Sequence, residues 1–125
     1  MILSVATAKS QGLTNALNDL KAKRIDSVIK KCALPFNLSA GSEIDNPNIS
    51  DAGVLKRKFQ TLFRKKYFDD FFKGKRTIDN SRMTISYEVR SFNDEGELES
   101  ESSLIFHFKK AKDGSLRLYK IMLAG

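Results

Sequence analysis

Apolar residues near the start of the chain recur with the spacing of one helix face. Four of them stand at i, i+3, i+4 and i+7, which predicts a helix from about Ser10 to Lys23. They are Leu13, Ala16, Leu17 and Leu20. A second short helical turn carries Val28 and Ile29, and we expect Asp26 to cap it.

Proline and glycine then divide the chain. Leu34-Pro35 ends the helical region, because the residue before a proline disfavours helix. Phe36-Asn37-Leu38 alternates, and Gly41-Ser42 can turn the chain toward Glu43-Ile44, which predicts a small hairpin. Asn46-Pro47-Asn48 predicts a turn after it.

A longer helix is predicted next, with Ser50 or Asp51 as its N-cap. Its apolar stripe has helical spacing and consists of Leu55, Phe59, Leu62 and Phe63. The phase of the apolar positions shifts near Lys65-Lys66, which indicates a break or bend. Gly74 is expected to end the helical region.

After Asn80 the apolar period changes to two, which is typical of strands. Turns are predicted at Asn93–Gly96 and at Asp113-Gly114, the second being a strong hairpin signal. The alternating apolar positions are Met83, Ile85, Tyr87 and Val89, then Leu104, Phe106 and Phe108, then a final strand over Leu116–Leu123 with apolar residues on both faces. We therefore predict a three-stranded antiparallel meander behind segregated helices, the α+β class.

This order of elements resembles the nuclear transport factor 2-like superfamily over nearly the whole chain. The segments that carry the resemblance are Leu34-Pro35-Phe36, Ile49-Ser50-Asp51 leading into the long helix, and Asp113-Gly114-Ser115 before the last strand. It implies an α+β cone, with N-terminal helices packed on a curved antiparallel sheet and ligands entering at its mouth. Members include isomerases, dehydratases, epoxide hydrolases, transport adaptors and small secreted proteins, and the fold alone does not choose among them.

Composition narrows the chemistry. With 125 residues the chain is long enough for one core, and its single Cys excludes an internal disulfide. One Cys and one His cannot form a Cys/His structural zinc site, so we expect no metal and no cofactor. No apolar run approaches the roughly 18 residues of a membrane span.

The first residues carry a different signal. Met1–Ser10 is a short apolar run ending in Ala-x-Ala, which resembles the end of a secretory signal, although a simple lead-in to the first helix is the alternative. We predict a signal-peptide remnant at 1–8 and one domain at 9–125. A secreted or periplasmic location follows from that interpretation, with the cytoplasm as the alternative.

Candidate catalytic groups are few. His107 lies on the same predicted strand as Phe106 and Phe108 but on its opposite face. A catalytic role would need an orienting carboxylate, for which Glu88 on the preceding strand is one candidate. Cys32 follows two lysines that could lower its pKa, but a small buried residue is the favoured interpretation. No acid/base pair can be placed, so the sequence leans away from an enzyme.

Aromatic residues supply the candidate ligand pocket, although a packed core is the simpler interpretation of the same rings. The pocket candidates are Phe59, Phe63, Tyr67, Phe71, Tyr87 and Tyr119. The segment from Asp51 to Arg76 contains nine Lys or Arg and three Asp. The candidates there for a basic binding surface are Lys56, Arg57, Lys65 and Lys66. An acidic run at period two is expected to line the solvent face of a hairpin and comprises Glu95, Glu97, Glu99 and Glu101.

The function that these observations favour is a non-catalytic domain, exported from the cytoplasm, that binds a small apolar ligand or a protein partner. A homodimer formed through the sheet is a further expectation. One alternative is a pocket enzyme of the isomerase or hydratase type. The other is an anionic polymer or nucleic acid bound by the basic helix 51–76, which we favour less because a solvated helix face explains the charge and no nucleic-acid motif accompanies it.

Overall fold

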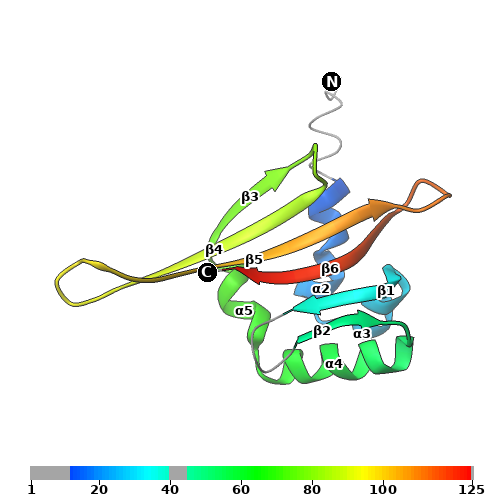
Figure 1. The fold of residues 1–125 in the computed structure, drawn as a ribbon, viewed down its shortest axis with the longest axis horizontal. Helices are drawn as coiled ribbons and strands as arrows, with labels where there is room; N and C mark the ends of the chain where they lie inside the picture. Colours follow the sequence, from blue (N-terminus) through cyan, green and yellow to red (C-terminus); the bar gives the residue numbers. More distant parts are fainter. Residues whose placement is uncertain (1–11, 40–44, 125) are drawn as a thin grey trace.

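The computed structural model describes residues 12–39 and 45–124 (Figure 1). Residues 12–16 are helical. The later elements are α2 (Asn18–Lys21), α3 (Ile25–Lys30), β1 (Cys32–Ser39), β2 (Asp45–Ile49), α4 (Ala52–Arg64), α5 (Tyr67–Phe72), β3 (Lys75–Asp79), β4 (Thr84–Phe92), β5 (Leu98–Lys110) and β6 (Leu116–Ala124). The six strands form one sheet in the order β2-β1-β6-β5-β4-β3. Every neighbouring pair is antiparallel except β1 and β6. The α+β prediction is confirmed.

The core lies between the helices and one face of the sheet. Alternate strand residues point into it, as the period of two predicts. The sheet contributes Phe36, Leu38, Ile85, Tyr87, Leu104, Phe106, Phe108, Leu118 and Ile121. The helical segments contribute Leu13, Leu17, Leu20, Val28, Leu55, Phe59, Leu62 and Phe68. These residues form one continuous cluster.

Aromatic rings fill the centre of this core. Phe59 contacts Phe36 and Phe68 with ring centroids 5.7 and 6.2 Å apart, and Phe68 contacts Phe106 at 6.1 Å. Phe72 then stacks on Phe106 at 5.8 Å. Rings from α4, α5, β1 and β5 thus hold the helices on the sheet through edge and stacked contacts.

Three predicted boundaries of the helical region are confirmed. Asp51 caps α4, its side chain accepting a hydrogen bond from the amide of Val54 at 3.0 Å. The helix breaks at Lys66, which adopts a left-handed φ of 55° between α4 and α5. Gly74 ends the region, and a Cβ there would lie 2.2 Å from the backbone oxygen of Glu88. Only glycine fits where the chain passes this close to β4.

Other predictions about single segments are wrong. Asp26 lies in the first turn of α3 but does not cap it, because Arg24 is the N-cap. Asn46-Pro47-Asn48 belongs to β2, an edge strand, where the missing proline N–H is tolerated. Met83 was predicted as the first apolar position of a strand, but it lies just before β4 and has a left-handed φ of 56°. The predicted strand at Phe36–Leu38 is part of β1, which pairs with β2, whereas the predicted turn at Gly41-Ser42 and second strand at Glu43-Ile44 fall outside the described residues.

A bulge in the last strand explains why its sequence shows apolar residues on both faces. The register of β5 and β6 shifts between His107 and Phe108, so that Tyr119 is an extra residue on β6. Because of this bulge, Leu118 and Ile121 both point into the core although they are three residues apart.

The predicted signal-peptide remnant at 1–8 lies outside the described residues and stays a prediction. Among residues 12–39 and 45–124, no helix is long and apolar enough to cross a membrane.

Candidate functional site

Five of the six predicted pocket residues join the aromatic core, and one does not. Phe59 and Tyr87 are fully buried, while Phe63, Tyr67 and Phe71 are half-buried on α4 and α5. Tyr119 lies on the other face of the sheet, its ring 6.2 Å from that of His107.

The inner side of the sheet holds one polar group among these rings. The hydroxyl of Tyr87 is buried and has no hydrogen-bond partner among the described residues. Lys21 places its ammonium 5.3 Å from the ring centroids of both Tyr87 and Phe72, a cation–π arrangement at the edge of the core. No carboxylate of the described chain is hydrogen-bonded to that hydroxyl.

His107 is not arranged as a catalytic base. Its cross-strand neighbours are Thr84 on β4 and Lys120 on β6, whereas Glu88 pairs with Ser103. Burial and the charge of Lys120 lower the pKa of His107, so its ring is neutral near pH 7. Its Nε2 is buried with no partner among the described residues. Within the same residues, no group of three His, Cys, Asp or Glu side chains could hold a metal ion.

An open cleft of about 510 Å³ lies at another place, between residues 12–16, the end of α3 and the β5–β6 hairpin. Its lining combines the apolar Gly12, Ala16 and Leu116, which we call the floor, with polar residues, which we call the rim. The rim residues are Asn15, Lys30, Lys31, Asp113, Ser115 and Arg117. A Cβ on Gly12 would lie 3.5 Å from Cδ1 of Leu116, so the glycine leaves the floor open where the helix passes β6.

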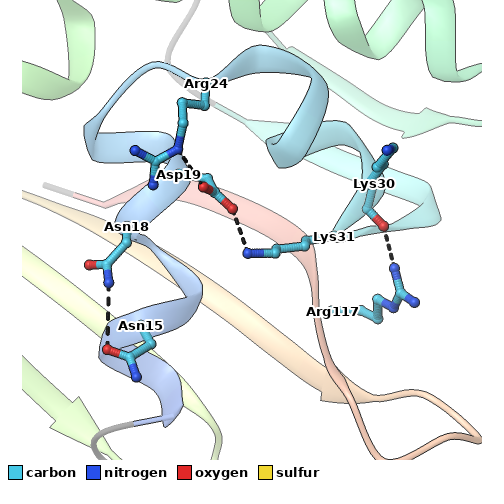
Figure 2. Close-up of polar contacts among 7 residues, drawn as sticks. All are labelled: Asn15, Asn18, Asp19, Arg24, Lys30, Lys31 and Arg117. Atoms are coloured by element: carbon cyan, nitrogen blue, oxygen red, sulfur yellow. Dashed lines mark hydrogen bonds and ion pairs between the residues drawn. The ribbon is translucent and has the colours of Figure 1, made fainter.

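An ion-pair network positions one side of the rim (Figure 2). Asp19, only 7% exposed, accepts hydrogen bonds from Arg24 at 2.8 Å and from Lys31. These two bonds lower the pKa of Asp19 and keep it ionised. The carboxylate therefore ties α2 to both ends of α3 and fixes the direction of the Lys31 side chain.

Arg117 builds the opposite side of the rim. Its guanidinium donates a hydrogen bond to the backbone oxygen of Lys30, as Figure 2 shows, and lies 4.0 Å from the carboxylate of Asp113. The amide of Leu118 donates to the oxygen of Lys31 at 3.1 Å, which joins β6 to the α3–β1 corner. The rim is thus held by contacts between segments far apart in the chain.

The cleft is electropositive. Its lining has three cations, Lys30, Lys31 and Arg117, against the one carboxylate of Asp113. Asp19 pairs with Lys31 and also with Arg24, whereas the ammonium of Lys30 has no ion-pair partner among the described residues. Hydrogen bonds from Ser115 lower the pKa of Asp113, so it remains charged and partly offsets Arg117. An apolar floor beside unmatched positive charge suits a ligand with an apolar body and an anionic group.

Sequence reasoning did not find this cleft. Lys30 and Lys31 drew attention only as neighbours of Cys32, and Asp113 only as a turn residue. Cys32 is partly buried against the core, and this burial raises the pKa of its thiol to about 12, with Arg117 opposing part of that shift. No local spacing signals the cleft, because the fold alone joins Lys30 to Arg117.

The basic helix shows a solvated face. Arg57, Lys65 and Lys66 are exposed, and Lys56 pairs with Asp26 at 2.9 Å. The opposite face of α4 carries the buried Leu55, Phe59 and Leu62. The helix is therefore amphipathic in the ordinary sense.

No protein-family model matches the chain, and no curated protein matches it. Solved structures with the same fold include a protein from Catenulispora acidiphila, with 12% identity, a TM-score of 0.53 and coverage of 92% of this chain and 86% of that one. ActVI-ORFA from Streptomyces coelicolor has 8% identity and a TM-score of 0.52, covering 97% of both chains. Aln2 from a Streptomyces species has 9% identity and a TM-score of 0.50, covering 98% of this chain and 93% of that one. The chain has the nuclear transport factor 2-like cone fold.

Proposed function

We propose that this protein is a non-catalytic binding domain for a small ligand that has an apolar body and one anionic group. The observation that carries the proposal is the cleft, with its apolar floor and its electropositive rim. Its volume of about 510 Å³ is within the range of small-molecule sites. This refines the expectation of a small apolar ligand by adding the anion.

In the proposed complex the apolar body lies on Leu116, Ala16 and Gly12. Burying about 100 Å² of apolar ligand surface there would contribute about 2.5 kcal/mol. The anionic group lies between Arg117 and Lys30, where the planar guanidinium can donate two parallel hydrogen bonds. Lys31 contributes less, because Asp19 already holds its ammonium.

Export and a homodimer remain part of the proposal. The outer face of the sheet carries the half-buried apolar side chains of Ile105 and Met122, which lie opposite each other on β5 and β6. These two residues support a dimer formed through the sheet. The exposed lysines and arginines of α4 would serve the alternative, an anionic polymer, and that alternative predicts binding that weakens steeply with salt.

A pocket enzyme of the isomerase or hydratase type is the other alternative. It requires an inward carboxylate beside the core aromatics, and the described residues place none at the Tyr87 hydroxyl. The acidic residues near α5 serve other contacts: Asp69 pairs with Lys23 at 3.1 Å, and Asp79 accepts hydrogen bonds from Ser81 and Arg82. These contacts favour the non-catalytic proposal.

The proposal is tested with two fluorescent probes that share one ring system. 8-Anilinonaphthalene-1-sulfonate carries an anionic sulfonate, and N-phenyl-1-naphthylamine is the same molecule without it. We expect the native protein to bind the sulfonate at least about tenfold more tightly, because one charged hydrogen bond of about 1.5 kcal/mol amounts to that factor. Arg117→Gln should remove the difference.

The matched control is Arg57→Gln, which removes the same charge from the exposed face of α4. It should leave the affinities for both probes unchanged. If the two probes bind equally well to the native protein, or if Arg57→Gln weakens the sulfonate as much as Arg117→Gln does, the cleft is not an anion-binding site.

A further inference from the structure

The β4–β5 hairpin extends beyond the rest of the sheet. Pairing of β3 with β4 stops at Glu88, and pairing of β6 with β5 stops at Ser103. Residues 89–92 and 98–102 therefore pair only with each other among the described strands. Figure 1 shows them projecting as a two-stranded ribbon at one end of the molecule. We call this segment, residues 89–102, the acidic ribbon.

The tip of the acidic ribbon combines exposed apolar surface with negative charge. Phe92 and Leu98 pair across the strands and are 58% and 52% exposed. No Lys or Arg occurs between Ser91 and Phe108. Five carboxylates occur in that stretch: Asp94, Glu95, Glu97, Glu99 and Glu101. An isolated two-stranded hairpin is marginally stable in water, so a projecting ribbon with an apolar pair gains from a partner surface.

The electropositive cleft lies at the opposite end of the same strand. β5 begins at Leu98 in the ribbon and ends at Lys110, beside the hairpin that supplies Arg117 and Leu116 to the cleft. Its 13 residues span roughly 40 Å when extended at about 3.4 Å each. The ribbon of one molecule thus cannot reach its own cleft, and the two ends of the molecule carry opposite charge.

We propose that the acidic ribbon of one copy docks into the cleft of a second copy. Phe92 and Leu98 would lie on the floor made by Leu116 and Ala16, and the carboxylates beside them would face Lys30 and Arg117. Charge complementarity selects this occupant, because two acidic ribbons repel each other and a symmetric ribbon-to-ribbon contact is disfavoured. The proposal rests on the proposed function, since the small anion and the ribbon would compete for one cleft.

This contact is head-to-tail, so each added copy exposes one new ribbon and one new cleft. A single ribbon tip in a cleft is a small interface, of the size found in weak and transient encounters. We therefore expect dissociation constants in the micromolar to millimolar range and no tight complex. Association should also weaken as salt shortens the Debye length from about 30 Å at 0.01 M to about 10 Å at 0.1 M.

Sedimentation velocity over a series of protein concentrations tests the proposal. The native protein should show an average mass that rises with concentration at low salt, beyond the mass of a dimer formed through the sheet. The ribbon variant, Phe92→Ser with Leu98→Ser, and the cleft variant, Arg117→Gln, should each lose that rise. Arg57→Gln should keep it, and circular dichroism verifies that every variant is folded.

The decisive measurement is a one-to-one mixture of the two variants. The mixture should regain association, because the cleft variant still has a ribbon and the ribbon variant still has a cleft. Native protein that shows no such rise, a ribbon variant whose mass still rises beyond that dimer, or a mixture whose mass does not would each overturn the proposal.

A last measurement separates this proposal from the proposed function. The ribbon variant should bind 8-anilinonaphthalene-1-sulfonate as the native protein does, and the same probe should dissociate native assemblies. If the probe binds but the protein does not self-associate, the ligand site is supported and the docking of the ribbon is refuted. If the protein self-associates and the probe has no effect, the ribbon and the ligand do not share the cleft, and the docking proposal is again refuted.

Discussion

Replacing Asp19 by Asn tests whether the buried carboxylate organises the α2–α3 corner. The substitution keeps the shape of the side chain but removes its charge. Arg24 and Lys31 bond to different oxygens of the carboxylate, so the amide keeps one of these acceptors and turns its NH₂ group toward the other cation. One of the two charged hydrogen bonds, from Arg24 or from Lys31, would thus be lost.

The size of the effect follows from burial. A hydrogen bond to a charged group contributes about 1.5–3 kcal/mol when its partners are shielded from water. Asp19 is shielded, but the side chains of Arg24 and Lys31 are 57% and 55% exposed, which weakens both bonds. We expect the free energy of unfolding to fall by about 2 kcal/mol, and Tm to fall by roughly 8 °C in a domain of this size.

Urea denaturation followed by circular dichroism measures the change, and Asp26→Asn is the matched control. Asp26 also pairs with a lysine, Lys56, at 2.9 Å, but its side chain is 80% exposed. The control should cost less than about 0.5 kcal/mol. Equal losses for the two variants would refute the argument that burial gives the Asp19 network its strength.

The pH dependence of stability provides a second measurement on the same variant. The pKa of Asp19 is lowered in the folded state by its bonds to Lys31 and Arg24. Its contribution is therefore fully present above the unfolded pKa, near 3.9, and is lost as pH falls through the lower folded value. The stability advantage of the native protein over Asp19→Asn should hold at pH 7 and shrink below about pH 4.

Three further predictions concern other parts of the fold. Gly74→Ala should lower the free energy of unfolding by at least about 2 kcal/mol in urea denaturation, because its Cβ would lie 2.2 Å from a backbone oxygen, whereas Gly12→Ala should be nearly neutral. His107 has a lowered pKa, so the stability of the native protein should decline as pH falls below about 6.5 and level off below the folded value, and His107→Gln should lack that decline in thermal melts. The thiol of Cys32, with its pKa raised to about 12, should react with Ellman's reagent only as fast as urea unfolds the chain, and rapid reaction in buffer would contradict its burial.

Local patterns predicted the parts of the fold that local physics determines. The α4 stripe buries Leu55 and Phe59 because a 3.6-residue period fixes which side chains share a face. Gly74 was correctly expected to end the helical region. By contrast, β3 contains Lys75, Arg76 and Thr77, all exposed, and it is a strand only because β4 offers it backbone partners. Such an edge strand has no apolar alternation for a sequence to show.

The candidate site was beyond local reasoning for a related reason. The Arg117 guanidinium donates to the Lys30 oxygen across 87 residues of chain, and neither residue has a neighbour in sequence that indicates this contact. The aromatic stretch from Tyr67 to Phe72 did show in the sequence, and the structure gives most of its rings to the core. Tertiary packing determines whether such rings line a pocket or fill the core, and the period of apolar residues in the sequence does not show which.

The parallel pairing of β1 with β6 bears on how the chain folds during its synthesis. β1 leaves the ribosome before β6, yet Leu38 pairs with Ile121, and Phe36 shares a core with Leu118. The inner edge of β1 stays without its partner until translation has passed β6, so the sheet closes late and over a long sequence separation. Until then this edge of β1 is unpaired and open to neighbouring nascent chains, a state that favours aggregation.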